Sequence, residues 1–481
     1  MTPEVQFFLQ LAARRRLATT QDLSSLVRHA PADIGLTGLL QEVVDHGIEN
    51  DLAVLQELAE EARTRARSHA ELPGRAPGAE RMPLAATNLG AAYYFPGLGD
   101  IRPLSSEDAA SVLTTVLSVA RREGVSDVHI TAGHLPTWRR WGILREIGEN
   151  PLDAATALTL NLALLPEEMA ARVGEGRDAT GAIVLPDGTR CRANVVAHHL
   201  GTAGSYHLVP DHVPSLGELG FANADTIERL LDFHNGLILV SGPAGSGKTT
   251  TLAALVQVLA RNRTGHVVTI EDPVEILHAK GNCGVSQREV GRHTATYATA
   301  LRSALREDPD IIVVGEMHDL ETMALALTAA ETGHLVLASM HTIDAASALN
   351  RILSVFPPNQ TPQVRAMVSE SLRGIIYQQL LPAPDGRQVL ASELLVNTPA
   401  VSHLIREGRT YHLEPTMQTG LAEGMQTMDR CILSLVRHGR LSADVARGVL
   451  RSRQALDDLA AMVEASRAPA PRPAAAKARR Y

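Results

Sequence analysis

Eight residues, Gly242-Pro-Ala-Gly-Ser-Gly-Lys-Thr249, match the pattern G-x-x-x-x-G-K-[ST] at every fixed position. The apolar run 236–240 before them predicts a strand, and residues 250–255 after them predict the start of a helix. A strand, a glycine-rich turn and a helix N-terminus in this order surround a phosphate with backbone N–H groups and partial positive charge. The flanking elements favour a phosphate cradle over a glycine-rich turn that matches the pattern by chance.

Each position of this cradle has an expected role toward ATP and Mg²⁺. The glycines let the backbone approach the phosphates closely, Lys248 bridges the β- and γ-phosphates, and the Thr249 hydroxyl ligates Mg²⁺. The predicted nucleotide-binding residues are Gly242, Gly245, Ser246, Gly247, Lys248, Thr249 and Thr250.

Composition and patterning divide the 481 residues into five regions. Apolar spacing predicts a helical extension over residues 1–70, and a segment rich in Pro, Gly and Ala predicts a linker over 71–104. A small α+β region follows over 105–212, with a helix at 106–123, strands at 127–131 and 182–185, and a hairpin at Asp187-Gly188. An α/β region spans 213–465, and the tail 466–481, rich in Ala, Pro and Arg, cannot bury a core and is expected to be disordered.

Four short apolar runs in the α/β region predict a parallel sheet with crossover helices: 237–240, 267–270, 311–314 and 335–338. Polar residues follow each run at once. The phosphate cradle follows the first run, Glu271-Asp-Pro-Val-Glu275 the second, Gly315-Glu316 the third, and Ser339-Met-His341 the fourth. Because ligands of open α/β sheets bind beyond the carboxyl ends of the strands, these residues are expected to converge on one site.

The carboxylates at these strand ends suit ATP hydrolysis, which needs Mg²⁺ near the γ-phosphate and an oriented water. Glu316 is the first candidate for polarising the water or steadying Mg²⁺, and Glu275, Glu271 and Asp272 can supply a second acidic arm. A plainer alternative is that Glu316 only favours a helix N-terminus, and that Glu271 and Asp272 are structural.

Two histidines flank the fourth run. If the step between them is extended, His334 and His341 lie roughly 20 Å apart, too far to share a metal ion. His341, at the strand end, is a candidate sensor of the γ-phosphate. His334, at the strand start, suits packing or hydrogen bonding.

Composition excludes several other classes. A net charge of −8 and 3% aromatic residues give no basic field or stacking platform for nucleic acid. Cys191, Cys283 and Cys431 lie far apart and form neither a disulfide framework nor a zinc motif. No apolar run is long enough to span a membrane and no signal peptide is evident, so we expect a cytoplasmic chain that a partner recruits to a membrane.

Longer segments resemble the PilT family of type IV pilus retraction ATPases. Arg302-Ser-Ala-Leu-Arg-Glu-Asp-Pro-Asp-Ile-Ile-Val-Val-Gly-Glu-Met317 resembles the family's Walker B region, and Ile270-Glu-Asp-Pro-Val-Glu275 resembles its Asp box. Residues 319–336 continue the match into the family's His box, which ends at His341-Thr342. Leu404-Ile-Arg-Glu407 and Gly424-Met-Gln-Thr-Met-Asp429 resemble its C-terminal segments. The likeness covers roughly residues 105–450.

The resemblance implies a PAS-like domain followed by a RecA-like P-loop ATPase domain, in a ring-shaped homohexamer. Such a motor would turn the inner-membrane platform protein from the cytoplasmic face and disassemble the pilus, and a paralogous retraction ATPase is a further candidate partner. Glu275 and Glu316 would be the acidic catalytic pair, with His341 beside them and His334, Glu271 and Asp272 in support. The missing four-cysteine zinc motif favours retraction over pilus assembly.

Two departures from the family pattern keep an alternative open. The family sends arginines from the PAS-like domain into a neighbouring subunit's nucleotide site, and Arg192 matches one of them. Leu200 and His207 stand where further arginines are expected. Because an arginine finger contributes orders of magnitude to rate, a nucleotide-binding accessory subunit with weak turnover is the alternative function. A DNA translocase on the same core is disfavoured by the charge.

Overall fold

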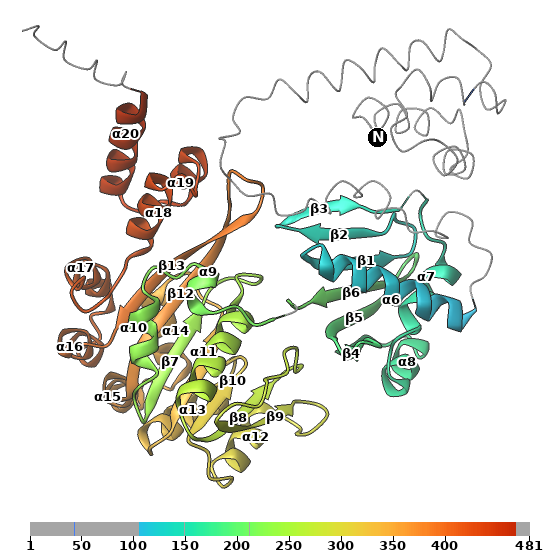
Figure 1. The fold of residues 1–481 in the computed structure, drawn as a ribbon. Coiled ribbons are helices and arrows are strands. Elements are labelled where there is room, and N and C mark those ends of the chain that lie inside the picture. Colours follow the sequence, from blue (N-terminus) through green and yellow to red (C-terminus); the bar gives the residue numbers. More distant parts are fainter. Residues whose placement is uncertain (1–42, 44–104, 149, 211, 468–481) are drawn as a thin grey trace, which may run out of the picture. The chain divides into compact units, whose positions relative to one another are not determined.

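The computed structural model describes Val43 and residues 105–148, 150–210 and 212–467. All of them except Val43 belong to one unit of the chain, Asn88–Tyr481. Two separate sheets organise this unit: a six-stranded sheet, here called the N-terminal sheet, and a seven-stranded sheet, here called the central sheet (Figure 1). Apart from Val43, the predicted helical extension 1–70 and linker 71–104 lie outside the described residues, as does the predicted tail beyond Arg467.

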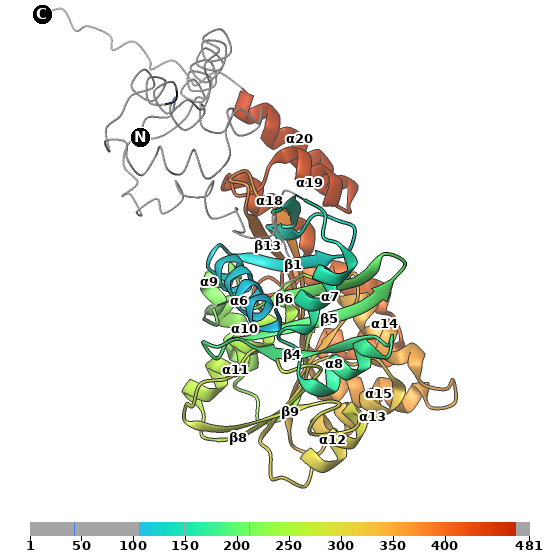
Figure 2. The same cartoon turned by 90° about the vertical axis from the view of Figure 1, so that its right-hand side faces the viewer.

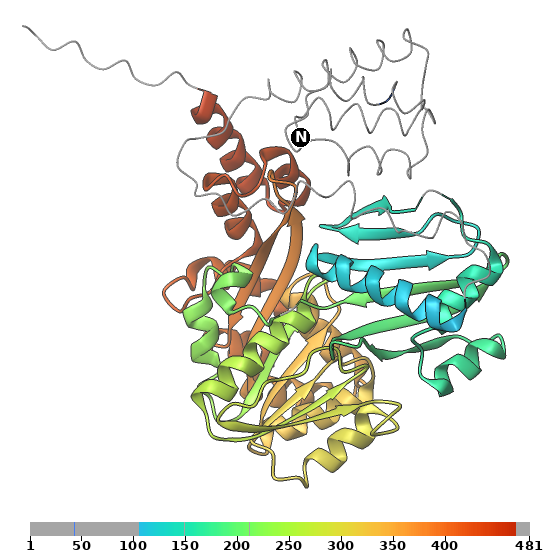
Figure 3. The same ribbon diagram turned by 45° about the vertical axis from the view of Figure 1, so that its right-hand side comes forward.

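The N-terminal sheet is antiparallel throughout, in the order β3-β2-β1-β6-β5-β4. Its region contains α6 (Ser106–Arg122), β1 (Val125–Thr131), β2 (Thr137–Arg140), β3 (Ile143–Glu146), α7 (Ala154–Leu162), α8 (Glu167–Gly174), β4 (Ala179–Val184), β5 (Arg190–His198) and β6 (Gly201–Leu208). Figure 3 shows α6 lying along one face of this sheet. The predicted helix and strands are confirmed, whereas β2, β3, α7 and α8 had no clear signal in the sequence.

Alternating burial explains why this sheet carries one core. Every second residue of β6 is buried, and Trp138 and Tyr206 are among the largest fully buried side chains. The Tyr206 hydroxyl donates to Asn161 Oδ1 at 3.0 Å, and the Asn161 amide donates to the Ile130 carbonyl at 3.1 Å. The predicted hairpin joins β4 to β5, and Gly188 supplies its positive φ of 82°.

The central sheet has the order β13-β12-β7-β11-β10-β8-β9, with β13 antiparallel to β12 and the remaining pairs parallel. Its strands are β7 (Gly236–Ser241), β8 (Gly265–Glu271), β9 (Cys283–Glu289), β10 (Ile311–Val314), β11 (Leu335–Met340), β12 (Leu372–Pro382) and β13 (Gln388–Val396). The four predicted strands are confirmed and lie next to one another as β7, β11, β10 and β8. The predicted α/β class is therefore confirmed, with an antiparallel edge strand added.

Helices cover both faces of the central sheet. Their bounds are α9 (Leu216–Leu219), α10 (Ala224–Leu230), α11 (Lys248–Asn262), α12 (Tyr297–Ala304), α13 (Leu320–Glu331), α14 (Ala345–Val355), α15 (Thr361–Ser371), α16 (Pro399–Glu407), the 3₁₀ turn η2 (Thr410–His412), α17 (Leu413–Thr419), α18 (Met428–Arg437), α19 (Ala443–Val449) and α20 (Arg453–Arg467). In Figure 2, α9, α10 and α11 lie on one side of the sheet and α13, α14 and α15 on the other.

Two hydrophobic clusters account for this layering. Leu237 and Leu239 of β7 face a core shared with α12 to α17, while Ile238 and Val240 face a core shared with α9, α10 and α11. Continuous burial on both faces is typical of parallel strands between helical layers. Among the described helices, none combines the length and apolar character needed to cross a lipid bilayer.

Glu393 on β13 is a buried carboxyl that ties the edge of the central sheet to α14. Its Oε1 accepts the Ala345 N–H at 2.9 Å, at the first residue of the helix. Burial raises the pKa of Glu393 to about 7, although the hydrogen bond from Ala345 and the charge of Arg451 act to lower it. The folded chain therefore holds a proton here that an unfolded chain releases near its ordinary pKa of 4.5.

Replacing Glu393 by Gln should flatten the pH dependence of stability. Because the pKa is raised on folding, the stabilisation is complete below about pH 4.5 and is lost as the pH rises through about 7. When the pH is raised from about 5 to about 8, the free energy of unfolding of the wild type should fall by on the order of 1–3 kcal/mol more than that of E393Q. Urea denaturation at each pH measures this free energy. The exposed Glu423→Gln is the matched control, and equal pH slopes for wild type and E393Q would contradict the prediction.

Candidate functional site

The carboxyl ends of β7, β11, β10 and β8 open into a cavity of about 790 Å³. The structure brings the predicted residues of all four strand ends to this cavity. Its walls include Gly245, Ser246, Gly247, Lys248, Thr249, Thr250, Glu271, Asp272, Glu275, Glu316 and His341. The cavity also receives Asp127, Arg139, Arg192 and His207 from the N-terminal sheet.

The glycine-rich turn has the backbone that a phosphate cradle requires. Gly245 and Gly247 adopt left-handed φ values of 71° and 85°, and α11 begins at the next residue, Lys248. A Cβ on Gly242 would overlap the Gln378 carbonyl oxygen. The Ser246 Oγ is buried and has no hydrogen-bond partner among the described residues. An orphaned buried hydroxyl beside an open glycine turn fits a phosphate group as the missing partner.

Lys248 has its ammonium group turned inward. The Nζ donates to the carbonyl oxygens of Gly242 at 3.1 Å and Pro243 at 2.9 Å, and to His341 Nδ1 at 3.2 Å. Burial lowers the pKa of Lys248, and the negative charge of Glu316 acts in the opposite direction. The ammonium thus lies at the point where the turn, β10 and β11 meet.

Glu316 lies between two imidazoles at the end of β10. Its Oε1 is 2.8 Å from His341 Nε2, and its Oε2 is 3.0 Å from His318 Nε2. The two rings stack with centroids 6.5 Å apart. Since the Lys248 ammonium can only donate, His341 accepts from it at Nδ1, and the other ring nitrogen, Nε2, lies next to Glu316. Lys248, His341 and Glu316 therefore form one connected chain of contacts.

The carboxylates after β8 differ in environment. Glu271 Oε1 accepts from Thr269 at 2.6 Å and from Gln287 at 3.1 Å, yet burial still raises its pKa. Burial and the charge of Glu289 also raise the pKa of Asp272. Glu275 is buried and forms an ion pair of 3.0 Å with Arg192 of β5. All three acids line the cavity, but Glu271 is held by hydrogen bonds and Glu275 by an ion pair.

Residues of the N-terminal sheet reach this acidic segment through β5. Arg190 Nη2 pairs with Glu289 at 2.7 Å, and its Nε donates to the Val274 carbonyl at 2.7 Å. Arg192, which pairs with Glu275, lies two residues further along the same strand and on the same face as Arg190. Arg192 therefore has an acidic partner within its own chain, and its role across a subunit boundary stays a prediction.

The two positions where arginine was expected differ from each other. His207 lines the cavity and its Nδ1 lies 2.9 Å from Asp127 Oδ1. Burial alone would raise the pKa of Asp127, but the contact with His207 outweighs it and the net pKa is lowered. Leu200 is 43% exposed, does not line the cavity and lies beside Gly133.

His334 lies at the opposite end of β11 from His341. Its Nδ1 is 3.1 Å from the Ala329 carbonyl oxygen near the end of α13, and its own carbonyl accepts the Gly236 N–H at 3.1 Å. These contacts fit the expected hydrogen-bonding role at the strand start.

Mg²⁺ fits this site only in company with phosphates. Within the described parts of the chain, no group of three or more His, Cys, Asp or Glu residues is arranged to hold a metal ion by itself. Thr249 is exposed to the cavity at the start of α11. Mg²⁺ is commonly held by substrate phosphates, water and one or two protein oxygens, which is the set this site offers.

Several residues of the site had no place in the sequence predictions. His318 follows Glu316 by two positions, and attention to neighbours of that carboxylate would have found it. Tyr297 at the start of α12 lines the cavity, and burial together with the charges of Asp272 and Glu316 raises its pKa. Gln378 comes from β12, far along the chain, and no local signal marks it.

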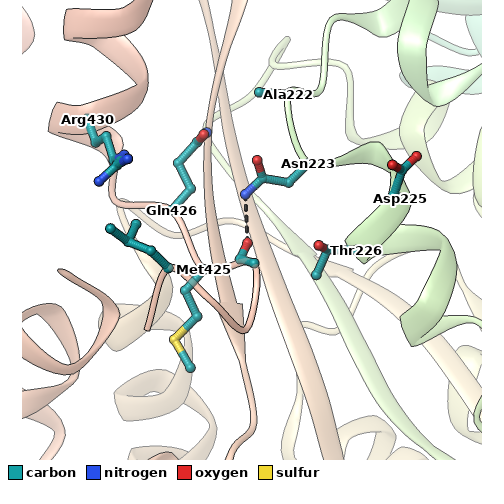
Figure 4. A pocket seen from close by; sticks show the side chains of 9 residues that line it. Ala222, Asn223, Asp225, Thr226, Met425, Gln426 and Arg430 are labelled. Atoms are coloured by element: carbon teal, nitrogen blue, oxygen red, sulfur yellow. Dashed lines mark hydrogen bonds between the residues drawn. The ribbon is translucent and has the colours of Figure 1, made fainter. Parts of the chain in front are cut away.

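A second hollow of about 240 Å³ lies between the start of α10 and the loop before α18 (Figure 4). Its lining includes Gly424, Met425 and Gln426, part of a segment that resembles the retraction ATPases. Asn223 donates to the Gly424 carbonyl at 2.6 Å across it. This hydrogen bond holds the loop in place.

A glycine-rich turn before a helix, on a mostly parallel sheet with acids beyond the adjacent strands, defines a P-loop ATPase. A family model described as "Type II/IV secretion system protein" matches residues 105–442. The type IV pilus retraction ATPase PilT of Pseudomonas aeruginosa is 41% identical over 335 residues, which are 70% of this chain and 97% of that protein. A twitching motility protein of Neisseria gonorrhoeae is 39% identical over 347 residues, covering 70% of this chain and 91% of the relative.

Comparison with solved structures indicates the same family as the sequence relatives. The crystal structure of the pilus retraction motor PilT with bound ADP has 36% sequence identity and a TM-score of 0.63, covering 72% of this chain and 98% of that one. The chain therefore belongs to the PilT family of ATPases, within the type II/IV secretion system proteins.

Replacing Gln378 by Ala should weaken nucleotide binding. Gln378 is 1% exposed, donates to the Ser246 carbonyl at 2.6 Å and accepts from Thr251 at 2.8 Å. Its removal leaves two buried polar groups unpaired beside the glycine turn, so we expect about a tenfold loss of ADP affinity. Titration with a fluorescent ADP analogue checks this, with the exposed Gln363→Ala on α15 as control. Unchanged affinity in a folded Q378A protein would contradict it.

Proposed function

We propose that this chain is the ATPase motor of type IV pilus retraction, working as a homohexamer. The observation that carries the proposal is the connected set Lys248, His341 and Glu316 at the P-loop, in a chain 41% identical to a pilus retraction ATPase over most of that relative's length. A phosphate-binding cation and a carboxylate in mutual reach are what hydrolysis of a phosphoanhydride requires.

The residues have distinct roles in the proposed reaction. Lys248 leaves the Gly242 and Pro243 carbonyls and binds the β- and γ-phosphates, while Glu316 orients and polarises the attacking water. His341 loses its donor when Lys248 turns to the phosphates, so it senses whether the γ-phosphate is present. Glu275 is the second acid. The Thr249 hydroxyl would hold Mg²⁺ together with the phosphates, and the ion would supply neutralisation of the phosphate charge there.

The N-terminal sheet completes the proposed site. Arg192 leaves Glu275 to meet developing negative charge, on its own or on a neighbouring subunit's nucleotide. The division into a PAS-like domain over residues 105–212 and a RecA-like domain over 213–465 would let ATP-driven movement change these contacts. Glu271, Asp272 and His334 support the backbone around them.

The proposed partners follow from the family. The hexamer would act at the cytoplasmic face of the inner membrane on the pilus platform protein, and a paralogous retraction ATPase is a further candidate. Nucleic acid is not among the proposed partners.

The second candidate function is a nucleotide-binding accessory subunit with weak turnover. It is favoured by Leu200, which lies away from the cavity, and by His207, which is engaged with Asp127. Fewer permanent cations then face the phosphates than in the family pattern, and a lower rate follows.

Glu316→Gln should lower ATP turnover to a small residual rate while nucleotide binding persists. The amide keeps the size of the carboxylate but loses the charge that polarises water, so we expect a loss of about a hundredfold or more in kcat. Phosphate release by the purified hexamer measures it, with the exposed Glu331→Gln at the end of α13 as control. Wild-type turnover no higher than that of E316Q would support the accessory subunit instead.

A strain carrying Lys248→Ala should be hyperpiliated and unable to twitch. Without the ammonium group the phosphates lose their main cationic contact, the motor stops, and assembled pili are not withdrawn. Electron microscopy of surface pili and a motility assay report the two effects. Cells without pili would instead indicate a role in pilus assembly.

A further inference from the structure

We propose that His318 is a positioning residue for Glu316. It holds the second oxygen of the carboxylate, so that Glu316 keeps one orientation toward the attacking water. The proposal rests on the ATP hydrolysis proposed above and adds a residue that neither the sequence motifs nor the P-loop pattern assigns.

The first argument is the placement of the two imidazoles. His341 Nε2 lies 2.8 Å from Oε1 and His318 Nε2 lies 3.0 Å from Oε2, so each carboxylate oxygen has its own nitrogen. The rings are nearly parallel, with an interplanar angle of 28°. The final torsion of a glutamate is broad, and a single contact would leave its carboxylate free to turn. A close nitrogen at each of the two oxygens restricts that rotation by contact from both sides.

The second argument is the backbone that carries His318. The Gly315 N–H donates to the Ile270 carbonyl at 2.8 Å, and the Met317 N–H donates to the Ser339 carbonyl at 3.0 Å. Immediately after His318, Asp319 caps α13 by accepting the Thr322 N–H at 2.8 Å. The loop between β10 and α13 is therefore fixed on both sides of His318, and its side chain is delivered to Glu316 by three separate anchors.

The third argument is the difference between the two histidines. His341 is tied to Lys248 at 3.2 Å, so its position follows that of the phosphate-binding ammonium. His318 has a side chain 58% exposed and does not line the cavity. It can hold Glu316 from outside while Lys248 and His341 rearrange around the phosphates.

The test uses three substitutions at one position in the full-length hexamer. His318→Gln retains an N–H donor near the position of Nε2, His318→Asn places its amide near Nδ1 instead, and His318→Ala removes both. We expect H318A and H318N to lower kcat about tenfold with KM for ATP unchanged, and H318Q to restore most of the rate. The exposed His234→Ala, at the opposite end of β7, should match the wild type.

A double mutant separates positioning from a general structural effect. If His318 acts through Glu316, adding H318A to E316Q should cost no further activity. Wild-type kcat in H318A, equal losses in H318Q and H318A, or an added loss in the double mutant would each overturn the proposal. Failure of the proposed function is a different result: the wild-type hexamer itself would show no turnover above E316Q.

Discussion

The buried ammonium group of Lys248 sets the geometry of the rest of the site. A charge withdrawn from water needs polar partners, and Lys248 finds them in the carbonyls of Gly242 and Pro243 and in His341. These carbonyls face the ammonium only because Gly245 and Gly247 turn the backbone through left-handed conformations. The turn and its lysine are therefore in direct contact, and a phosphate bound in the turn would have to replace some of these contacts.

The segment from β8 to β9 links the two sheets through charge. Its acids face the nucleotide cavity through Asp272 and Glu275, and Glu289 at the end of β9 pairs with Arg190 of the N-terminal sheet. Arg190 and Glu289 are both largely buried, so removal of either charge would leave the other uncompensated. The Arg192–Glu275 pair is more exposed on its arginine side, at 44%, and is the weaker of the two. The Arg190–Glu289 pair therefore joins the two sheets, while the more exposed Arg192–Glu275 pair can exchange partners more easily.

The sequence was most informative where short local patterns determine structure. The P-loop and the polar ends of four strands follow from apolar runs and glycines, and the parallel order of the sheet then had to bring them together. Local patterns could not predict the role of Gln378, because it lies 132 residues along the chain from Ser246, to which it donates a hydrogen bond. The polar strand β9 was missed because pairing with β8, not apolar alternation, forms it. Roles across a subunit boundary depend on copies of the chain that local patterns do not describe.

The charge facing the phosphates depends on which cations are already engaged. Arg192 and Lys248 are permanent charges, but each is held by a group that itself belongs to the site, Glu275 and the turn carbonyls. His207 is likewise engaged, because its Nδ1 lies against the Asp127 carboxyl. Phosphate binding therefore has to release cations from existing partners, and part of its favourable energy is spent on that exchange. The same exchange frees Glu275 and His341 for new contacts. Phosphate binding in the cradle is therefore coupled to the ion pairs and hydrogen bonds that the nearby acids make.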